Sequence, residues 1–326
     1  TTSASSVDDP ELIARQHRLY RQNVGGNLRT FLKAMTRDPA MCEYLDSVLN
    51  KKGKPNENFG RELIELFTLG ERSTYASYAE ADIPLVALCF TGYGVDANEN
   101  FQFNPSNHDF TTNRSLWGAT RTTGDANDGD WLIDQILAKV DGSGHSYCAR
   151  YIVTRLWKEF IGDPATSVVT IQAIADQFSG AFSWDLKSLY RALFTSAEFV
   201  DPLSRATRIK SPVELYVTYF RALAITPTKW DENLWTCYTL DQDLLDPPNV
   251  FGWPGGTNWI TVKTLVDRRE YMSWMGWGYR NQVPERLNNV LDILLLAGDP
   301  IGGSPSGTSA ADRSRQYITD PAFNLR

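Results

Sequence analysis

The sequence is poor in the residues and motifs on which the commonest enzyme sites are built. Histidine occurs only three times, at His17, His108 and His145, and none of them belongs to an H-E-x-x-H motif. A phosphate-binding loop, a dinucleotide-binding fingerprint and a G-x-S-x-G elbow are also missing. These absences argue against the common nucleotide-binding enzymes, zinc proteases and serine hydrolases.

Long apolar runs and an excess of basic charge are lacking as well. No run approaches the roughly 18 apolar residues of a membrane-spanning helix. The 32 Lys and Arg residues are outnumbered by 39 Asp and Glu, so the formal net charge is −7. Binding to nucleic acid requires a basic surface for the phosphates. We therefore expect no membrane span in this chain and no nucleic-acid partner.

Cysteine is scarce, and its spacing excludes the usual zinc motifs. Cys42, Cys89, Cys148 and Cys237 lie far apart and form no C-x-x-C pair. An even number of cysteines can form two disulfides, and a chain of 326 residues can equally bury four free thiols in its core. The residues alone leave both alternatives open.

Signals for the start of a helix are frequent. A capping residue followed by proline occurs in five places: Asp9-Pro10, Asp38-Pro39, Asp163-Pro164, Ser211-Pro212 and Asp320-Pro321. Two serines, Ser77 and Ser211, are followed three residues later by the glutamate of a capping box. The sequence predicts a mainly α, multi-helical globular array. Helices are expected over residues 10–21, 26–36, 39–50, 57–69, 78–92, 130–140, 145–161, 165–179, 186–195, 212–223, 261–278, 284–296 and 309–318.

Residues 93–125 interrupt this helical pattern. Three short aromatic or β-branched pieces, at 93–95, 101–103 and 115–117, are separated by Asn, Asp, Gly and Pro, which predicts a small β-hairpin excursion. Two other stretches, 246–261 and 299–309, are rich in Pro and Gly and are expected to be irregular. We expect one compact unit, with a helical region over 1–92, the β excursion over 93–125 and a second helical region over 126–326.

The segment 56–70 predicts a helix with two distinct faces. At 100° per residue its polar side chains fall within an arc of about 140°, opposite the apolar ones. The polar residues are Glu57, Asn58, Arg61, Glu62, Glu65 and Thr68. Such a face is either solvated or a site. The absence of Lys and Gln favours a site, in which Glu62 and Glu65 share a proton or a cation and Arg61 pairs with the carboxylates.

Two further segments contain candidate functional residues. His108 and Asp109 lie in a turn-rich loop, where functional groups are common, although a surface histidine bonded to Asp109 is the alternative. His145 is interpreted as a helix-terminus residue, and His17 has no assigned role. The Pro- and Gly-rich segment 246–261 contains Trp253 and Trp259, two of ten tryptophans. These rings either pin the loop to the core or stack on a sugar, and we expect Trp253 to be the buried pin and Trp259 to face a cleft.

Several stretches, spread in order along nearly the whole chain, resemble the bacterial family known as Domain of Unknown Function 1800. They are residues 38–46, 55–70, 91–93, 108–109, 209–214 and 247–260, of which N-E-N-F-G-R-E-L-I-E-L-F-T-L-G and P-P-N-V-F-G-W-P-G-G-T-N-W-I are the most specific. Two residues depart from the family pattern. Cys89 stands where small or charged residues are usual. Gly60 replaces the usual Ala in mid-helix, at a cost of roughly 1 kcal/mol, which suggests a close approach by another helix.

The resemblance implies an extracytoplasmic helical protein, periplasmic, at the cell surface or secreted, and it implies no reaction. Members usually carry about a hundred more residues upstream, so an upstream fragment as a separate chain is an expected partner. A companion protein of the alkaline-phosphatase superfamily is another. Export also leads us to expect at least one disulfide, with Cys89 as one of its two members.

Two functional hypotheses follow. The first is an extracytoplasmic enzyme, for example a metal-assisted hydrolase, with Glu62, Glu65, His108 and Asp109 as catalytic groups. A divalent metal would be held by Glu62, Glu65 and His108, and Asn58 and Arg61 would assist binding. The second is a non-catalytic cell-envelope or carbohydrate-binding protein, in which Trp253 and Trp259 provide the binding surface and the polar helix face is a structural clamp.

Overall fold

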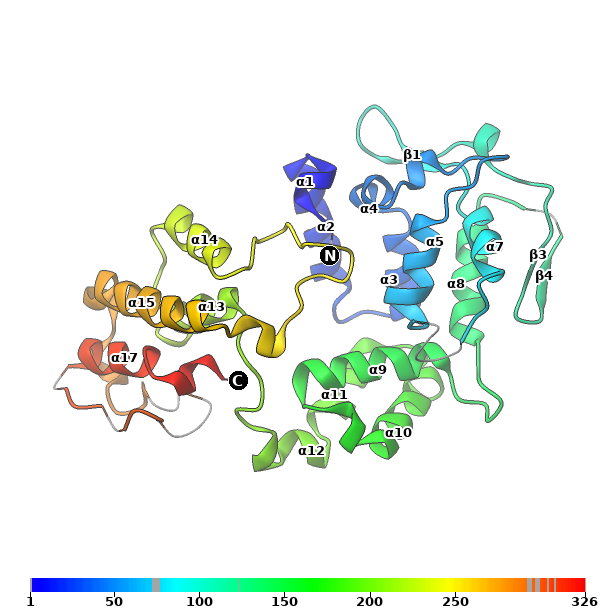
Figure 1. Cartoon of the computed structure of the whole chain (residues 1–326). Helices are drawn as coiled ribbons and strands as arrows, with labels where there is room; N and C mark the ends of the chain where they lie inside the picture. The colour runs from blue at the N-terminus through cyan, green and yellow to red at the C-terminus, as the bar shows by residue number, and fades with distance from the viewer. Residues whose placement is uncertain are drawn as a thin grey trace. The chain divides into compact units, whose positions relative to one another are not determined.

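The computed structural model describes residues 2–71, 77–122, 124–291, 295–296, 300–303, 305–307 and 309–325 (Figure 1). The chain divides into two compact units. We call Thr2–Val200 the N-terminal unit and Asp201–Arg326 the C-terminal unit. The boundary lies within the expected helical region 126–326. No helix in the described ranges has the length and apolar character needed to cross a membrane.

The N-terminal unit is mainly helical, as predicted. Its α-helices are α1 (Ala4–Val7), α2 (Pro10–Asn23), α3 (Leu28–Met35), α4 (Pro39–Tyr44), α5 (Asn58–Glu62), α7 (Asp82–Leu88), α8 (Asp128–Ala138), α9 (Tyr147–Phe160), α10 (Val168–Ser179), α11 (Leu186–Phe194) and α12 (Ala197–Val200). A π-helix, η2 (Leu63–Thr68), continues α5, and 3₁₀ turns cover Ser47–Leu49, Pro105–Asn107 and Pro164–Thr166.

Two of the predicted capping signals start helices in this unit. The carboxylate of Asp9 accepts from the backbone N–H groups of Glu11 and Leu12 at the start of α2. Asp38 caps α4 through the N–H of Met41. The proline after each cap occupies the first helical position, where a backbone N–H has no partner within the helix. The missing N–H of proline therefore costs no hydrogen bond.

The β excursion consists of two separate hairpins. Strands β1 (Tyr93–Val95) and β2 (Phe101–Phe103) pair antiparallel, with Tyr93 opposite Phe103. Strands β3 (Arg114–Leu116) and β4 (Ala119–Arg121) form the second antiparallel pair. The first two strands match the predicted pieces, and the third begins one residue earlier than predicted. A mainly α fold with small β-hairpins is therefore confirmed.

We call α5 and η2 together, Asn58–Thr68, the motif helix. Its α5 part packs closely on α7, and the two lie side by side in Figure 1. A Cβ at Gly60 would lie 2.9 Å from Cγ1 of Val86 and 3.3 Å from the backbone nitrogen of Ala87. The close approach inferred from this glycine is confirmed. Beside it, the rings of Phe59 and Phe90 meet edge to face at 4.9 Å, a favourable aromatic geometry.

The C-terminal unit is built from α13 (Pro212–Ala222), α14 (Trp230–Thr239), α15 (Val262–Gly278) and α17 (Ala310–Ile318). Short 3₁₀ turns cover Pro202–Ser204, Gly256–Trp259, Arg280–Gln282, Glu285–Leu287 and Pro321–Asn324. The predicted capping box at Ser211 and Glu214 is present at the start of α13. Tyr219, Met275, Leu291 and Phe323 are among the residues of the buried core.

Three expectations about elements need correction. The helix expected over 78–92 covers only Asp82–Leu88, because the side chains of the predicted box do not cap it and Ala81 occupies the N-cap. Helices α1, α12 and α14 were not expected. Before Leu291, the segment 284–296 forms only a 3₁₀ turn, Glu285–Leu287, whereas Leu291 and Leu295 are helical as expected and residues 292–294 lie outside the described ranges.

The expected disulfide is also wrong. Cys42, Cys89, Cys148 and Cys237 are all free and buried. They lie at different places in the fold, in α4, after α7, in α9 and in α14, where each packs as a small apolar side chain. The thiols of Cys42 and Cys89 point at the backbone carbonyls of Thr36 and Leu85.

Candidate functional site

The motif helix is not α-helical throughout, so the residues after Glu62 do not all face the side that an α-helix predicts. From Leu63 to Thr68 the backbone is a π-helix, which advances more residues per turn than an α-helix. Thr68, which the α-helical period places on the polar face, is consequently buried, and its hydroxyl donates to the carbonyl oxygen of Leu63 at 2.6 Å. π-Helical turns are rare and are frequent at functional sites.

Arg61 is the centre of an ion-pair cluster on this face. Its guanidinium lies 3.1 Å from Glu57, 3.6 Å from Glu65 and 2.8 Å from Glu80. The predicted pairing of this arginine with the helix carboxylates is thus observed for Glu57 and Glu65. Asn58 belongs to a different contact, since its amide donates to Asp46 at 2.7 Å. All of these groups are partly accessible to solvent.

Glu62 and Glu65 occupy different environments although they are three residues apart. Glu65 accepts a hydrogen bond from the hydroxyl of Tyr78 at 2.7 Å and also faces Arg61. Glu62 is half-buried, and its buried Oε2 has no hydrogen-bond partner among the described residues. Burial, and secondarily the charge of Glu65, raise the pKa of Glu62, while Arg61 opposes the shift. Glu62 is therefore the carboxyl that holds its proton more readily than an ordinary glutamate.

His108 lies in a fully buried network rather than on a surface loop. Its Nδ1 is 2.5 Å from the carbonyl oxygen of Thr91, and its Nε2 is 3.2 Å from Oδ2 of Asp128. Both partners are hydrogen-bond acceptors. Asp128 also pairs with Arg114 at 3.0 Å and with Arg121 at 2.6 Å. The imidazole, Asp128 and Arg114 have no exposed side-chain surface, which indicates a structural role.

Asp109 also serves the local backbone. Its carboxylate accepts from the N–H groups of Thr111 and Thr112 and from the hydroxyl of Thr112. Burial alone would raise the pKa of Asp109, but the hydrogen bonds from Thr112 and Thr111 and the nearby charge of Arg114 outweigh it and lower the pKa to about 2. Asp109 therefore fixes the turn that leads from His108 to β3.

The structure does not join these two groups of residues into one cluster. Among the described residues, no hydrogen bond or ion pair connects Glu62 or Glu65 with His108 or Asp109. Within the same ranges, no three His, Cys, Asp or Glu side chains are grouped so that they could hold a metal ion. The residues thus do not fit the metal centre considered from the sequence, and we derive no step through a metal.

Of the two loop tryptophans, Trp259 rather than Trp253 is the buried one. Trp259 is 5 % exposed, whereas Trp253 is half-buried. Trp259 ends the 3₁₀ turn before α15, and its carbonyl oxygen accepts from the hydroxyl of Thr264 at 2.9 Å, which ties it to the first turn of that helix. The expectation that Trp259 faces a cleft was wrong, and a stacking surface made of both rings is not present.

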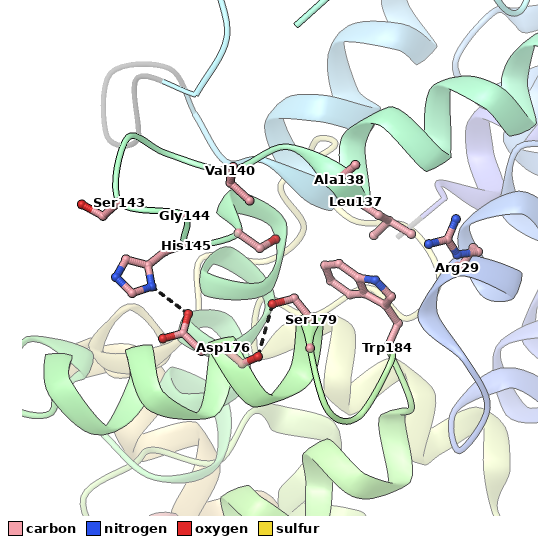
Figure 2. Close-up of a pocket in the computed structure, with 12 residues that line it drawn as sticks. Arg29, Leu137, Ala138, Val140, Ser143, Gly144, His145, Asp176, Ser179 and Trp184 are labelled. Atoms are coloured by element: carbon pink, nitrogen blue, oxygen red, sulfur yellow. Dashed lines mark hydrogen bonds and ion pairs between the residues drawn. The ribbon is translucent and has the colours of Figure 1, made fainter. Parts of the chain in front are cut away.

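A pocket that the sequence did not reveal lies in the N-terminal unit (Figure 2). It has a volume of about 560 Å³. Figure 2 shows Trp184 in the middle, Arg29 at one end and His145 at the other. Nδ1 of His145 lies 2.8 Å from Oδ1 of Asp176, and both side chains are partly exposed. The sequence spacing gives no signal for this pocket because its walls come from α3, α8, α10 and the segments around them.

Ser179, one of the serines that line the pocket, is not arranged as a nucleophile. The hydroxyl of Ser179 donates to the backbone carbonyls of Ala175 and Asp176, and in Figure 2 the second ring nitrogen of His145 points away from it. A histidine base would have to contact the hydroxyl that it activates. We therefore assign the candidate catalytic groups to the motif helix rather than to this pocket.

Comparison with known proteins supports the resemblance seen in the motifs. Searches of curated proteins and of solved structures find no match. The family model described as "Protein of unknown function (DUF1800)" matches residues 1–319. Because that match covers almost the full length, the chain belongs to the DUF1800 family.

Proposed function

We propose that this protein is an enzyme that hydrolyses a polar substrate with Glu62 as general acid and Glu65 as its companion carboxylate. The observation that carries this proposal is the contrast between the two side chains. Arg61 and Tyr78 hold Glu65, whereas Glu62 has a buried oxygen without a hydrogen-bond partner among the described residues. Two neighbouring carboxyls in unequal environments are a common basis for acid–base chemistry.

The proposed reaction needs only these groups and water. The proton of Glu62 passes to the leaving-group oxygen as the bond to that oxygen breaks. A water molecule supplies the hydroxyl that replaces it, and the proton of this water passes to Glu65. Exchange with solvent then returns Glu62 to its protonated form and Glu65 to its charged form. The net change is the addition of one water molecule across the broken bond.

The raised pKa of Glu62 supports the acid role, because a general acid must hold its proton near the working pH. The register change at Leu63 supports the choice of site, since π-helical turns are frequent at functional sites. We also propose an extracytoplasmic location and a companion protein of the alkaline-phosphatase superfamily. The support for both is the family resemblance.

A substrate screen on the full chain tests the proposal. The probes are p-nitrophenyl glycosides, p-nitrophenyl acetate and p-nitrophenyl phosphate, each measured between pH 4 and pH 8. We expect turnover of one class. We expect Glu62→Gln to lower that turnover by roughly 10²–10⁴-fold, the usual contribution of a general acid.

Glu57→Gln is the matched control, because Glu57 lies on the same face, contacts the same arginine and has no assigned chemical step. It should retain the turnover of the unmodified protein. Failure of the protein to hydrolyse any of the three classes, or full activity in Glu62→Gln, would overturn the proposal.

A further inference from the structure

The C-terminal unit contains a groove between α13 and α14 that plays no part in the proposed reaction. Its volume is about 410 Å³, which falls in the range of roughly 300–1,000 Å³ typical of small-molecule sites. The floor is formed by buried side chains, among them Tyr216, Phe220 and Cys237. At the mouth, Val217, Trp230 and Leu234 are 43 %, 61 % and 48 % exposed.

Two buried polar groups line this apolar groove, the hydroxyl of Tyr216 and the amide of Asn233. Asn233 is 6 % exposed, and neither its Oδ1 nor its Nδ2 has a partner at hydrogen-bonding geometry among the described residues. A buried amide without partners is unfavourable, so native proteins seldom retain one without a reason.

The oxygen of this amide is available to a ligand. The hydroxyl of Tyr279 accepts from the backbone N–H groups of Thr228 and Lys229, and among the described residues neither polar atom of Asn233 has a partner at hydrogen-bonding geometry. An amide oxygen accepts hydrogen bonds and donates none. The acceptor Oδ1 is therefore open to a donor on a ligand.

We propose that this groove binds an uncharged apolar molecule carrying one hydrogen-bond donor, which is directed at Oδ1 of Asn233. The apolar lining fits the body of such a molecule, and the unused acceptor fits its donor. An anionic ligand is disfavoured, because its charge would lie against an amide oxygen and apolar walls. The one charged lining residue, Arg221, is exposed.

The experiment uses the full chain and two matched probes, 3-phenylpropan-1-ol and its methyl ether, with affinities measured by ligand-observed NMR titration. The ether keeps the apolar body and loses only the donor. We expect the alcohol to bind roughly tenfold more tightly than the ether, the ratio that one hydrogen bond typically gives. In Asn233→Leu the two probes should bind with equal affinity.

A second pair of variants separates loss of the site from loss of folding. Val217→Glu introduces a charge at the mouth of the groove, at a position exposed enough to tolerate it, and should abolish binding of the alcohol. Val262→Glu is the control, because Val262 is 87 % exposed and does not line the groove, and it should bind as the unmodified protein does.

Four results would overturn the proposal. They are the absence of alcohol binding at millimolar concentration, equal affinity for alcohol and ether in the unmodified protein, tighter binding of 3-phenylpropionate than of the alcohol, and a dimer in sedimentation that Val217→Glu dissociates. The third would assign the groove to an anion at Arg221, and the fourth to a second copy of the chain. None of them bears on Glu62, so the test is independent of the proposed hydrolytic site.

Discussion

Nε2 of His108 lies 3.2 Å from Oδ2 of Asp128, and neither side chain is exposed to solvent. Asp128 also carries the ion pairs of two arginines, Arg114 and Arg121. The carboxylate of Asp128 therefore contacts one histidine and two arginines. The histidine expected to act in catalysis therefore helps to hold the β3–β4 hairpin against the start of α8.

Removing this shared carboxylate should destabilise the protein strongly. We expect Asp128→Asn to lower the free energy of unfolding by about 3–5 kcal/mol, because Arg114 would remain buried without its ion pair. Urea denaturation followed by circular dichroism measures the loss. The control is Asp125→Asn, whose carboxylate is 56 % exposed and pairs with the same Arg121, and it should cost less than about 1 kcal/mol. Similar losses for the two variants would contradict a structural network centred on Asp128.

The pH dependence of stability should reveal the environment of Glu62. Because the pKa of Glu62 is raised in the folded protein, deprotonation of this carboxyl lowers the free energy of unfolding. The loss is complete above the pKa of Glu62 in the folded protein and absent below its pKa in the unfolded chain, about 4.5. Glu62→Gln removes this loss. The melting temperature of this variant, relative to the unmodified protein, should therefore be higher at pH 8 than at pH 4. An equal difference in melting temperature at the two pH values would mean that the pKa of Glu62 is not raised.

A side chain at position 60 should destabilise the folded protein. Its Cβ would lie 2.9 Å from Val86, a stiff, fully buried residue, and overpacking of this kind costs about 1–3 kcal/mol. The higher helix propensity of alanine compared with glycine offsets about 1 kcal/mol of this destabilisation. We expect a net loss of about 1 kcal/mol for Gly60→Ala in urea denaturation. Gly142→Ala, where a Cβ would meet no atom within 4 Å, should leave stability unchanged or slightly raised.

The two loop tryptophans should differ in their contribution to stability. Trp259→Ala removes a buried ring and should cost about 3–5 kcal/mol. Trp253→Ala should cost clearly less, because Trp253 is only half-buried. Thermal melts of both variants give the comparison. A larger loss of stability for Trp253→Ala than for Trp259→Ala would support the prediction from the sequence that Trp253 is the ring that anchors the loop.

All four cysteines should titrate as free thiols. Burial raises the pKa of Cys42 and of Cys89 to about 12, and no cysteine is exposed, so Ellman's reagent should react with none in the native protein. In urea without reductant it should report four thiols per chain. Pretreatment with reductant is the control and should leave that number unchanged. Two thiols before and four after reduction would show that a disulfide is present.

The features predicted correctly from the sequence are those encoded by neighbouring residues. Asp9, Asp38 and Ser211 cap helices because the N–H groups they accept from lie two or three residues away. The hairpin strands at Tyr93 and Phe101 are likewise visible as short aromatic pieces between turn residues. In the candidate site, the pairing of Arg61 with Glu57 and Glu65 could be predicted from their spacing of four residues along the helix.

Features that depend on packing could not be predicted in this way. The partner of His108 was sought in its neighbour Asp109, but Asp109 is used by its own turn and the actual partner is twenty residues along the chain. Trp259 is buried and Trp253 is half-buried, and the irregular segment that contains both has no period that would show which ring packs inward. Thr68 lies on the buried side because the backbone is a π-helix there. This could not be predicted, since no composition signal distinguishes a π-helical turn from an α-helical one.

The π-helix also affects how this segment responds to a change in length. Its hydrogen bonds close over one more residue than those of an α-helix, so Leu63–Thr68 accommodates a surplus residue within otherwise helical chain. A single deletion here would be absorbed by rewinding the segment as an α-helix, with everything up to Glu62 left in place. The hydroxyl of Tyr151, which donates to the carbonyl oxygen of Leu66 at 2.7 Å, would then meet a different residue. The length of this segment, as well as its composition, therefore determines which groups face α9.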